Sequence, residues 1–84
     1  MSDESITARI ERLVNEEQQL RDREQTDRSD PDALEAETDR LRAVEVELDQ
    51  CWDLLRQRRA ARETGRDPAE AQLRPPDVVE KYIG

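Results

Sequence analysis

The side chains in this sequence that could carry out chemistry are carboxylates, arginines and a single cysteine. Histidine is absent, and serine stands only at positions 2, 5 and 29, so a hydrolytic nucleophile has no base to activate it. One cysteine excludes an internal disulfide, and without histidine it leaves little to bind zinc. The sequence therefore predicts a protein that is not an enzyme and that has no cofactor or metal.

Two glutamates could form a carboxylate layer between helices. Glu17 and Glu37 fall on the stripes of two predicted helices, and the helix pairing described below places them opposite each other. In a dimer four such carboxylates would converge, but di-iron sites of this kind also need Glu-x-x-His motifs. We therefore expect these carboxylates to be solvated or to pair with Arg21 or Arg40.

Basic residues gather near the predicted end of the second helix, with Glu63 among them: Arg56, Arg58, Arg59, Arg62 and Arg66. They could contact phosphate or an acidic protein surface. A structural role is favoured, because cations stabilise a helix C-terminus and arginine stems cover apolar surface. The aromatic residues that accompany many nucleic-acid sites are missing here. The acidic first half of a second copy is another candidate partner.

Cys51 and Trp52 are the only residues of their types. Cys51 falls on an apolar stripe, so we expect a small buried hydrophobe rather than a redox sensor. Trp52 flanks that stripe, and we expect it to pack at a helix–helix or subunit contact.

Two helices must position these residues. Ile6, Ile10, Leu13 and Leu20 lie on one helical face, which predicts a helix from about Asp3 to Gln25. Residues 26–30 are polar turn formers, and Asp30 before Pro31 indicates a new helix start. This second helix is predicted to run to Thr64 and stop at Gly65. Its leucines recur every seventh residue, as in coiled coils: Leu34, Leu41, Leu48 and Leu55.

The two predicted helices are expected to form an antiparallel hairpin. Pairing Leu20 with Leu34 gives a register in which opposed residue numbers sum to 54, so that Ile6 faces Leu48. The first helix then ends near Cys51, and the second continues alone for about 13 residues, or roughly 20 Å. A tail or a partner would have to cover that overhang.

The tail, residues 65–84, carries apolar residues of its own. A short helix is predicted from Asp67-Pro68 through Leu73, ended by Pro75-Pro76. Apolar side chains follow at Val78, Val79, Tyr82 and Ile83. We expect the tail to fold back on its hairpin or to reach a partner, and we expect residues 1–84 to form one helical-hairpin domain.

The composition favours self-association. Charged residues make up 43% of the chain and hydrophobic residues 33%, so one copy has little apolar surface to bury. Small domains without disulfides or metals commonly need a partner. We predict a homodimer with a four-helix arrangement, formed through the apolar part around Val14, Val44, Cys51, Trp52 and Leu55. The candidate interaction surface consists of these residues together with Arg56, Arg58, Arg59 and Arg62.

Charge and hydropathy limit the partners and the cellular compartment expected for this protein. The net charge of −8 argues against general binding to nucleic acid or anionic membranes. The polar N-terminus indicates no signal peptide, and no apolar run approaches membrane-spanning length. An unpaired cysteine fits a reducing compartment. We therefore predict a cytoplasmic protein without a membrane partner.

VELDQCWDLLRQRRA (Val46 to Ala60), followed by Gly65-Arg66-Asp67-Pro68 and Arg74-Pro75-Pro76, resembles Domain of Unknown Function family 2630. ITARIERLVNEE (Ile6 to Glu17) resembles the same family, so the likeness covers nearly the whole chain. The resemblance implies an actinobacterial origin and supplies no catalytic or binding residue.

Two function hypotheses remain. The first is a non-enzymatic, self-associating helical module with an interaction or structural role. The alternative is a regulator that binds RNA polymerase or nucleic acid, either through the Arg56–Arg66 cluster or through the acidic hairpin tip, residues 27–32.

Overall fold

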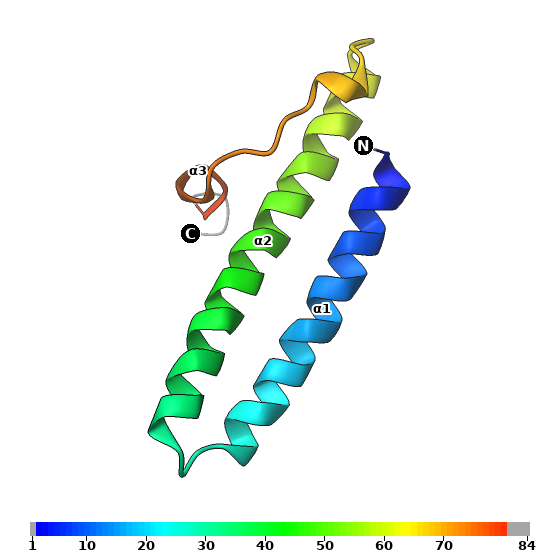
Figure 1. The fold of residues 1–84 in the computed structure, drawn as a ribbon. Coiled ribbons are helices and arrows are strands. Elements are labelled where there is room, and N and C mark those ends of the chain that lie inside the picture. Colours follow the sequence, from blue (N-terminus) through cyan, green and yellow to red (C-terminus); the bar gives the residue numbers. More distant parts are fainter. Residues whose placement is uncertain (1, 81–84) are drawn as a thin grey trace.

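The structure is a computed structural model that describes residues 2–80. It contains α1 (Asp3–Thr26), α2 (Pro31–Glu63), the 3-10 helix η1 (Pro68–Glu70) and α3 (Pro76–Glu80). Helices α1 and α2 lie side by side and antiparallel, and the tail runs back along α2 (Figure 1). This arrangement confirms the predicted all-α helical hairpin.

Capping side chains define where both long helices begin. The Ser2 hydroxyl accepts a hydrogen bond from the Ser5 backbone N–H at 3.1 Å. The Asp30 carboxylate accepts one from the Ala33 N–H at 3.3 Å, and Pro31 follows at the first helical position. Each cap satisfies a backbone donor that has no partner inside its helix.

A glycine cap ends α2 and reverses the chain. Gly65 has a φ of +77°, a conformation that glycine adopts without a Cβ penalty. Its N–H donates to the Arg62 carbonyl at 3.3 Å, and the Arg66 N–H donates to the Ala61 carbonyl at 2.7 Å. This pair of bonds is the Schellman motif, and it directs the tail back toward the middle of α2.

The core lies between α1 and α2. Each helix contributes buried apolar side chains at heptad-like spacing: Ile6, Ile10, Leu13, Leu20, Val44, Leu48, Cys51 and Leu54. Partly buried apolar residues pack against this cluster, among them Val14, Leu41 and Leu55. The apolar stripes predicted from the sequence therefore meet, as a hairpin requires.

The helix register differs from the prediction. Residue numbers of cross-helix ion pairs sum to 56, 61 and 66 for Glu16–Arg40, Asp3–Arg58 and Arg21–Glu45. These values centre near 61, so the predicted sum of 54 is wrong by about one heptad. The apolar pattern repeats every seven residues, and a heptad shift therefore preserves apolar contact. The observed register also brings Asp3 to Arg58 and Leu54 into the core.

This register shortens the predicted overhang of α2. Helix α1 reaches the level of Arg58 rather than ending near Cys51, and the tail packs against α2 (Figure 1). The opposed Glu17–Glu37 layer does not form. Glu17 instead lies 3.6 Å from Arg21, and Glu37 lies beside Asp27 near the hairpin turn.

Candidate interaction surface

Trp52 is the most exposed large apolar side chain in the described part of the chain. It is 55% exposed, and Leu73 at 47% is the other large apolar residue on the surface described. Successive helix residues turn by about 100°. Because Cys51 faces the core, Trp52 points from the flank of the hairpin into solvent.

Two residues of the predicted surface belong to the core instead. Val44 is 0% exposed and Cys51 is 2% exposed, so neither side chain is available to a partner. Neither residue therefore belongs to the candidate surface. Desolvation by burial raises the pKa of the Cys51 thiol, which favours the unreactive protonated form. Cys51 thus behaves as the buried hydrophobe expected from its position.

Leu55, Arg56 and Arg59 lie on the same side of α2 as Trp52. They follow it by three, four and seven residues, spacings that share a helical face. Leu55 is half-buried against the core, and both arginines are exposed. We call these four residues the Trp52 surface.

Val14 lies on the same flank of the hairpin as this surface. On α1, Arg21 follows Val14 by seven residues, so the two side chains lie on the same face of the helix. On α2, Glu45 precedes Trp52 by seven residues and likewise lies on the same face as Trp52. The Arg21 guanidinium lies 3.4 Å from the Glu45 carboxylate. The half-buried Val14 therefore borders the Trp52 surface from α1.

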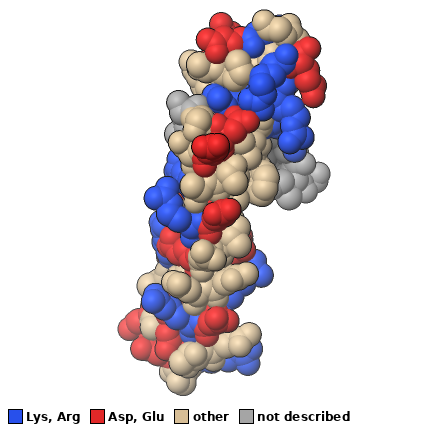
Figure 2. Space-filling model, turned by 90° about the vertical axis from the view of Figure 1, so that its right-hand side faces the viewer, with Lys and Arg blue, Asp and Glu red and all other residues tan. Residues whose placement is uncertain are grey.

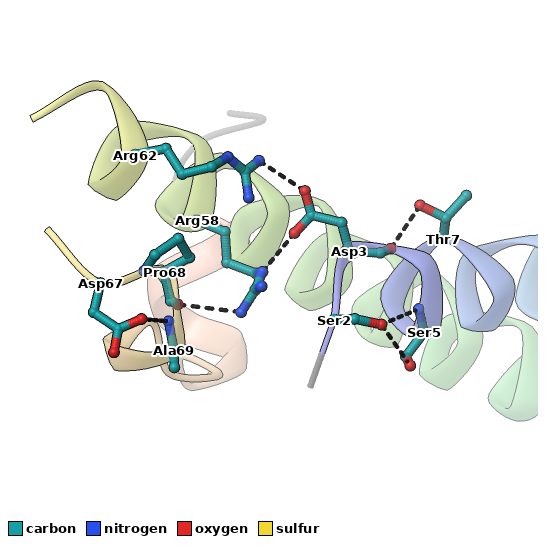
Figure 3. Close-up of polar contacts among 9 residues, drawn as sticks. All are labelled: Ser2, Asp3, Ser5, Thr7, Arg58, Arg62, Asp67, Pro68 and Ala69. Atoms are coloured by element: carbon teal, nitrogen blue, oxygen red, sulfur yellow. Dashed lines mark hydrogen bonds and ion pairs between the residues drawn. The ribbon is translucent and has the colours of Figure 1, made fainter. Parts of the chain in front are cut away.

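Arg58 and Arg62 hold the start of α1 against the end of α2 (Figure 3). Their guanidinium nitrogens lie 2.5 and 2.7 Å from the two carboxylate oxygens of Asp3. Arg58 also donates to the Pro68 carbonyl at 3.2 Å, and only 13% of its side chain is exposed. Hydrogen bonds from Arg62 and Arg58 hold the pKa of Asp3 below its ordinary value.

These contacts give two arginines of the basic cluster a structural role. Figure 2 shows acidic and basic side chains intermixed along most of the α1 side of the molecule, with basic side chains gathered near its upper end. A nucleic-acid contact would have to compete with Asp3 for Arg58 and Arg62.

Another face of α2 carries a row of polar residues that was not predicted from the sequence. Gln50, Asp53 and Gln57, which we call the tail clamp, are spaced by three and four residues. Asp53 is only 4% exposed. Its carboxylate accepts a hydrogen bond from Gln57 Nε2 at 2.8 Å and lies 3.5 Å from Arg74 Nε.

The tail clamp binds mainly the backbone of the tail. Gln50 Nε2 donates to the Arg74 carbonyl at 3.0 Å. Gln57 Nε2 donates to the Gln72 carbonyl at 2.8 Å, and Gln57 Oε1 accepts from the Gln72 N–H at 3.4 Å. In the sequence, these three residues are marked only by their spacing of three and four along α2. That spacing does not reveal that the tail supplies their hydrogen-bond partners.

The tail lies against its own α2 over its described residues. The helix expected from Asp67 to Leu73 is shorter, since η1 covers only Pro68–Glu70 and Ala71 is extended. Val78 in α3 is half-buried. The side chains of Val79, Tyr82 and Ile83, also predicted to contact the hairpin or a partner, lie outside the described part of the chain.

Carboxylates crowd the hairpin tip. The Asp27 carboxylate within hydrogen-bond reach, followed by desolvation, raises the pKa of Glu37. Glu24 Oε1 and Glu37 Oε2 are buried without hydrogen-bond partners. Within residues 2–80, no group of three or more His, Cys, Asp or Glu side chains is arranged to hold a metal ion.

Fold and surface together define a small helical hairpin with a clamped tail. The chain belongs to the family described as "Protein of unknown function (DUF2630)", which matches residues 2–84. It is 51% identical over 83 residues to uncharacterised proteins of Mycobacterium bovis and Mycobacterium tuberculosis, covering 99% of this chain and 92% of theirs. No solved structure matches it significantly. Among the described helices, none is both long and apolar enough to span a membrane.

Proposed function

We propose that this protein is a non-enzymatic helical interaction module that self-associates through the Trp52 surface. The observation that carries the proposal is the exposure of 55% of Trp52 in the middle of a long helix. Tryptophan is enriched among the residues that dominate binding energy at protein interfaces. Its neighbours Leu55 and Val14 extend the apolar area, and Arg56 and Arg59 form a polar rim.

The shape of the protomer supports association. Its radius of gyration is 15.6 Å, whereas a compact chain of this length has about 12 Å. It exposes 6100 Å², against about 5,200 Å² expected for a compact monomer of its mass. The excess of about 900 Å² is similar to the ~800 Å² that each partner buries in a standard interface.

Light scattering coupled to size-exclusion chromatography tests the proposal. We expect a dimer at micromolar concentration in about 150 mM salt, where screening limits repulsion between chains of net charge −8. Trp52→Ala should weaken the dimer by about 2–4 kcal/mol, as expected for a buried aromatic anchor.

Leu73→Ala provides the matched control, because it truncates the other large exposed apolar side chain. The control should associate as the wild type does, and circular dichroism should show unchanged helix content in both variants. A wild-type protein that remains monomeric up to hundreds of micromolar contradicts the proposal.

A further inference from the structure

We infer that two copies meet at the Trp52 surface in an antiparallel, two-fold arrangement, with Glu45 of each copy facing Arg59 of the other. The inference rests on the proposed function, because it assigns a geometry and specific partner residues to the same self-association. It follows from the order of charges along one exposed face of α2.

That face is acidic before Trp52 and basic after it. Glu45 precedes Trp52 by seven residues and Arg59 follows it by seven, and all three side chains are exposed. Residues seven apart lie on nearly the same helical face. Asp49 and Arg56, three residues before and four after Trp52, repeat the same order of charge.

This order is self-complementary only when the helices run in opposite directions. A two-fold axis at Trp52 would stack the two tryptophans and place position 45 of each copy against position 59 of the other, twice per dimer. A parallel arrangement would set Glu45 against Glu45 and Arg59 against Arg59. Like charges in contact oppose such pairing.

The contacts within one copy are compatible with this geometry. The Glu45 side chain remains 48% exposed although it lies 3.4 Å from Arg21, and a carboxylate has further acceptor sites for a second arginine. Val14 borders the same flank, so α1 of each copy would lie beside the partner. The result is a four-helix arrangement with the tail clamps on its outer sides.

A mixing experiment with charge-reversal variants tests the pairing. One sample carries Glu45→Lys and the other Arg59→Glu, so that each homodimer gains two like-charge contacts. We expect the dimer Kd of each variant alone to rise at least about 10-fold, since two ion pairs are replaced by repulsion. In a 1:1 mixture every contact is again between opposite charges, and a heterodimer should form with near wild-type Kd.

Glu35→Lys and Arg66→Glu serve as matched controls, because they change the net charge equally at exposed positions away from Trp52. We expect no selective pairing between them. If the wild type dimerises but the mixture of surface variants associates no more tightly than either alone, the antiparallel pairing is wrong and the proposed function stands. If the wild type is monomeric throughout, the proposed function itself fails.

Discussion

At the scale of single residues, Asp3 joins the two distant ends of the hairpin. It pairs with Arg58 and Arg62 from the first turn of α1, while Glu4 beside it is exposed. Because hydrogen bonds from Arg62 and Arg58 lower the pKa of Asp3 in the folded state, its ionised form stabilises the fold. That contribution is present above the ordinary value of 3.8 and is lost as the pH falls through the lower, folded-state value.

We therefore expect Asp3→Asn to lower the melting temperature at pH 7. The difference from the wild type should shrink as the pH falls from 3.8 through the lower folded-state pKa, where Asp3 of the folded wild type becomes protonated. Thermal melts followed by circular dichroism, at pH 7 and at a pH below 3.8, measure the difference in melting temperature. Glu4→Gln removes a neighbouring charge with the same position relative to the helix dipole, and it should show a smaller effect. Equal losses in both variants would contradict the role given to the Asp3 contacts.

Glu37 should respond to pH in the opposite direction. Its pKa is raised by the Asp27 carboxylate, by desolvation and by the charge of Glu24, with Arg23 opposing. A raised carboxyl pKa contributes stability below the unfolded value of 4.5, and this contribution is lost as the pH rises through the folded value. At neutral pH the ionised Glu37 therefore destabilises the hairpin tip.

Glu37→Gln should accordingly raise the melting temperature at pH 7, and the gain should vanish below pH 4.5. The exposed Glu35 on the same helix offers a control, since Glu35→Gln removes a charge away from this cluster. A Glu37→Gln variant no more stable than the wild type at pH 7 would show that the ionised Glu37 does not destabilise the fold.

At the scale of elements, the tail is attached mainly by side-chain contacts rather than by a large apolar interface. Leu73 is 47% exposed, and Gln57 alone makes three hydrogen bonds, two of them to the Gln72 backbone. Segments with few buried apolar contacts open at lower free energy than the core.

Gln57→Ala should therefore release the tail without unfolding the hairpin. Each net hydrogen bond contributes roughly 0.5–1.5 kcal/mol, so amide exchange at Gln72 should accelerate by about 10-fold or more. Hydrogen exchange detected by NMR measures this, with Leu13 in the core as an internal reference that should not change. Unaltered exchange at Gln72 would mean that the tail clamp does not hold the tail.

The helix boundaries could be predicted from sequence because capping residues act locally. Ser2, Asp30 and Gly65 each specify a helix end through contacts within a few residues. The register could not be predicted, because leucines repeating every seventh residue make adjacent heptad pairings look alike. Only the long-range contact between Asp3 and Arg58 separates them.

The candidate interaction surface could be predicted only in part, because its local features follow from helix geometry whereas its burial depends on the helix register. The flank position of Trp52 follows from helical geometry, and its exposure agrees with that position. Cys51 was expected at a partner surface because the predicted register ended the first helix near that residue. Val44 was included with it, although the same register already placed Val44 opposite Ile10. Once α1 reaches Arg58, both side chains are enclosed by the protomer itself.

At the scale of the whole molecule, the hairpin is an elongated body measuring 54 × 24 × 16 Å. One long side of α2 carries the tail clamp, and another carries the Trp52 surface. Because these two faces lie apart on the helix, a partner could bind at Trp52 without displacing the tail.

The most direct test of the account is the environment of Trp52 as a function of protein concentration. Trp52 is the only tryptophan in the chain, so its fluorescence reports this surface alone. Between about 0.1 and 100 μM, a range that spans common dimer affinities, we predict a blue shift of its emission and decreasing quenching by acrylamide. The transition should coincide with dimer formation seen by light scattering. Emission and quenching that stay constant while the protein dimerises would contradict the claim that Trp52 is the contact.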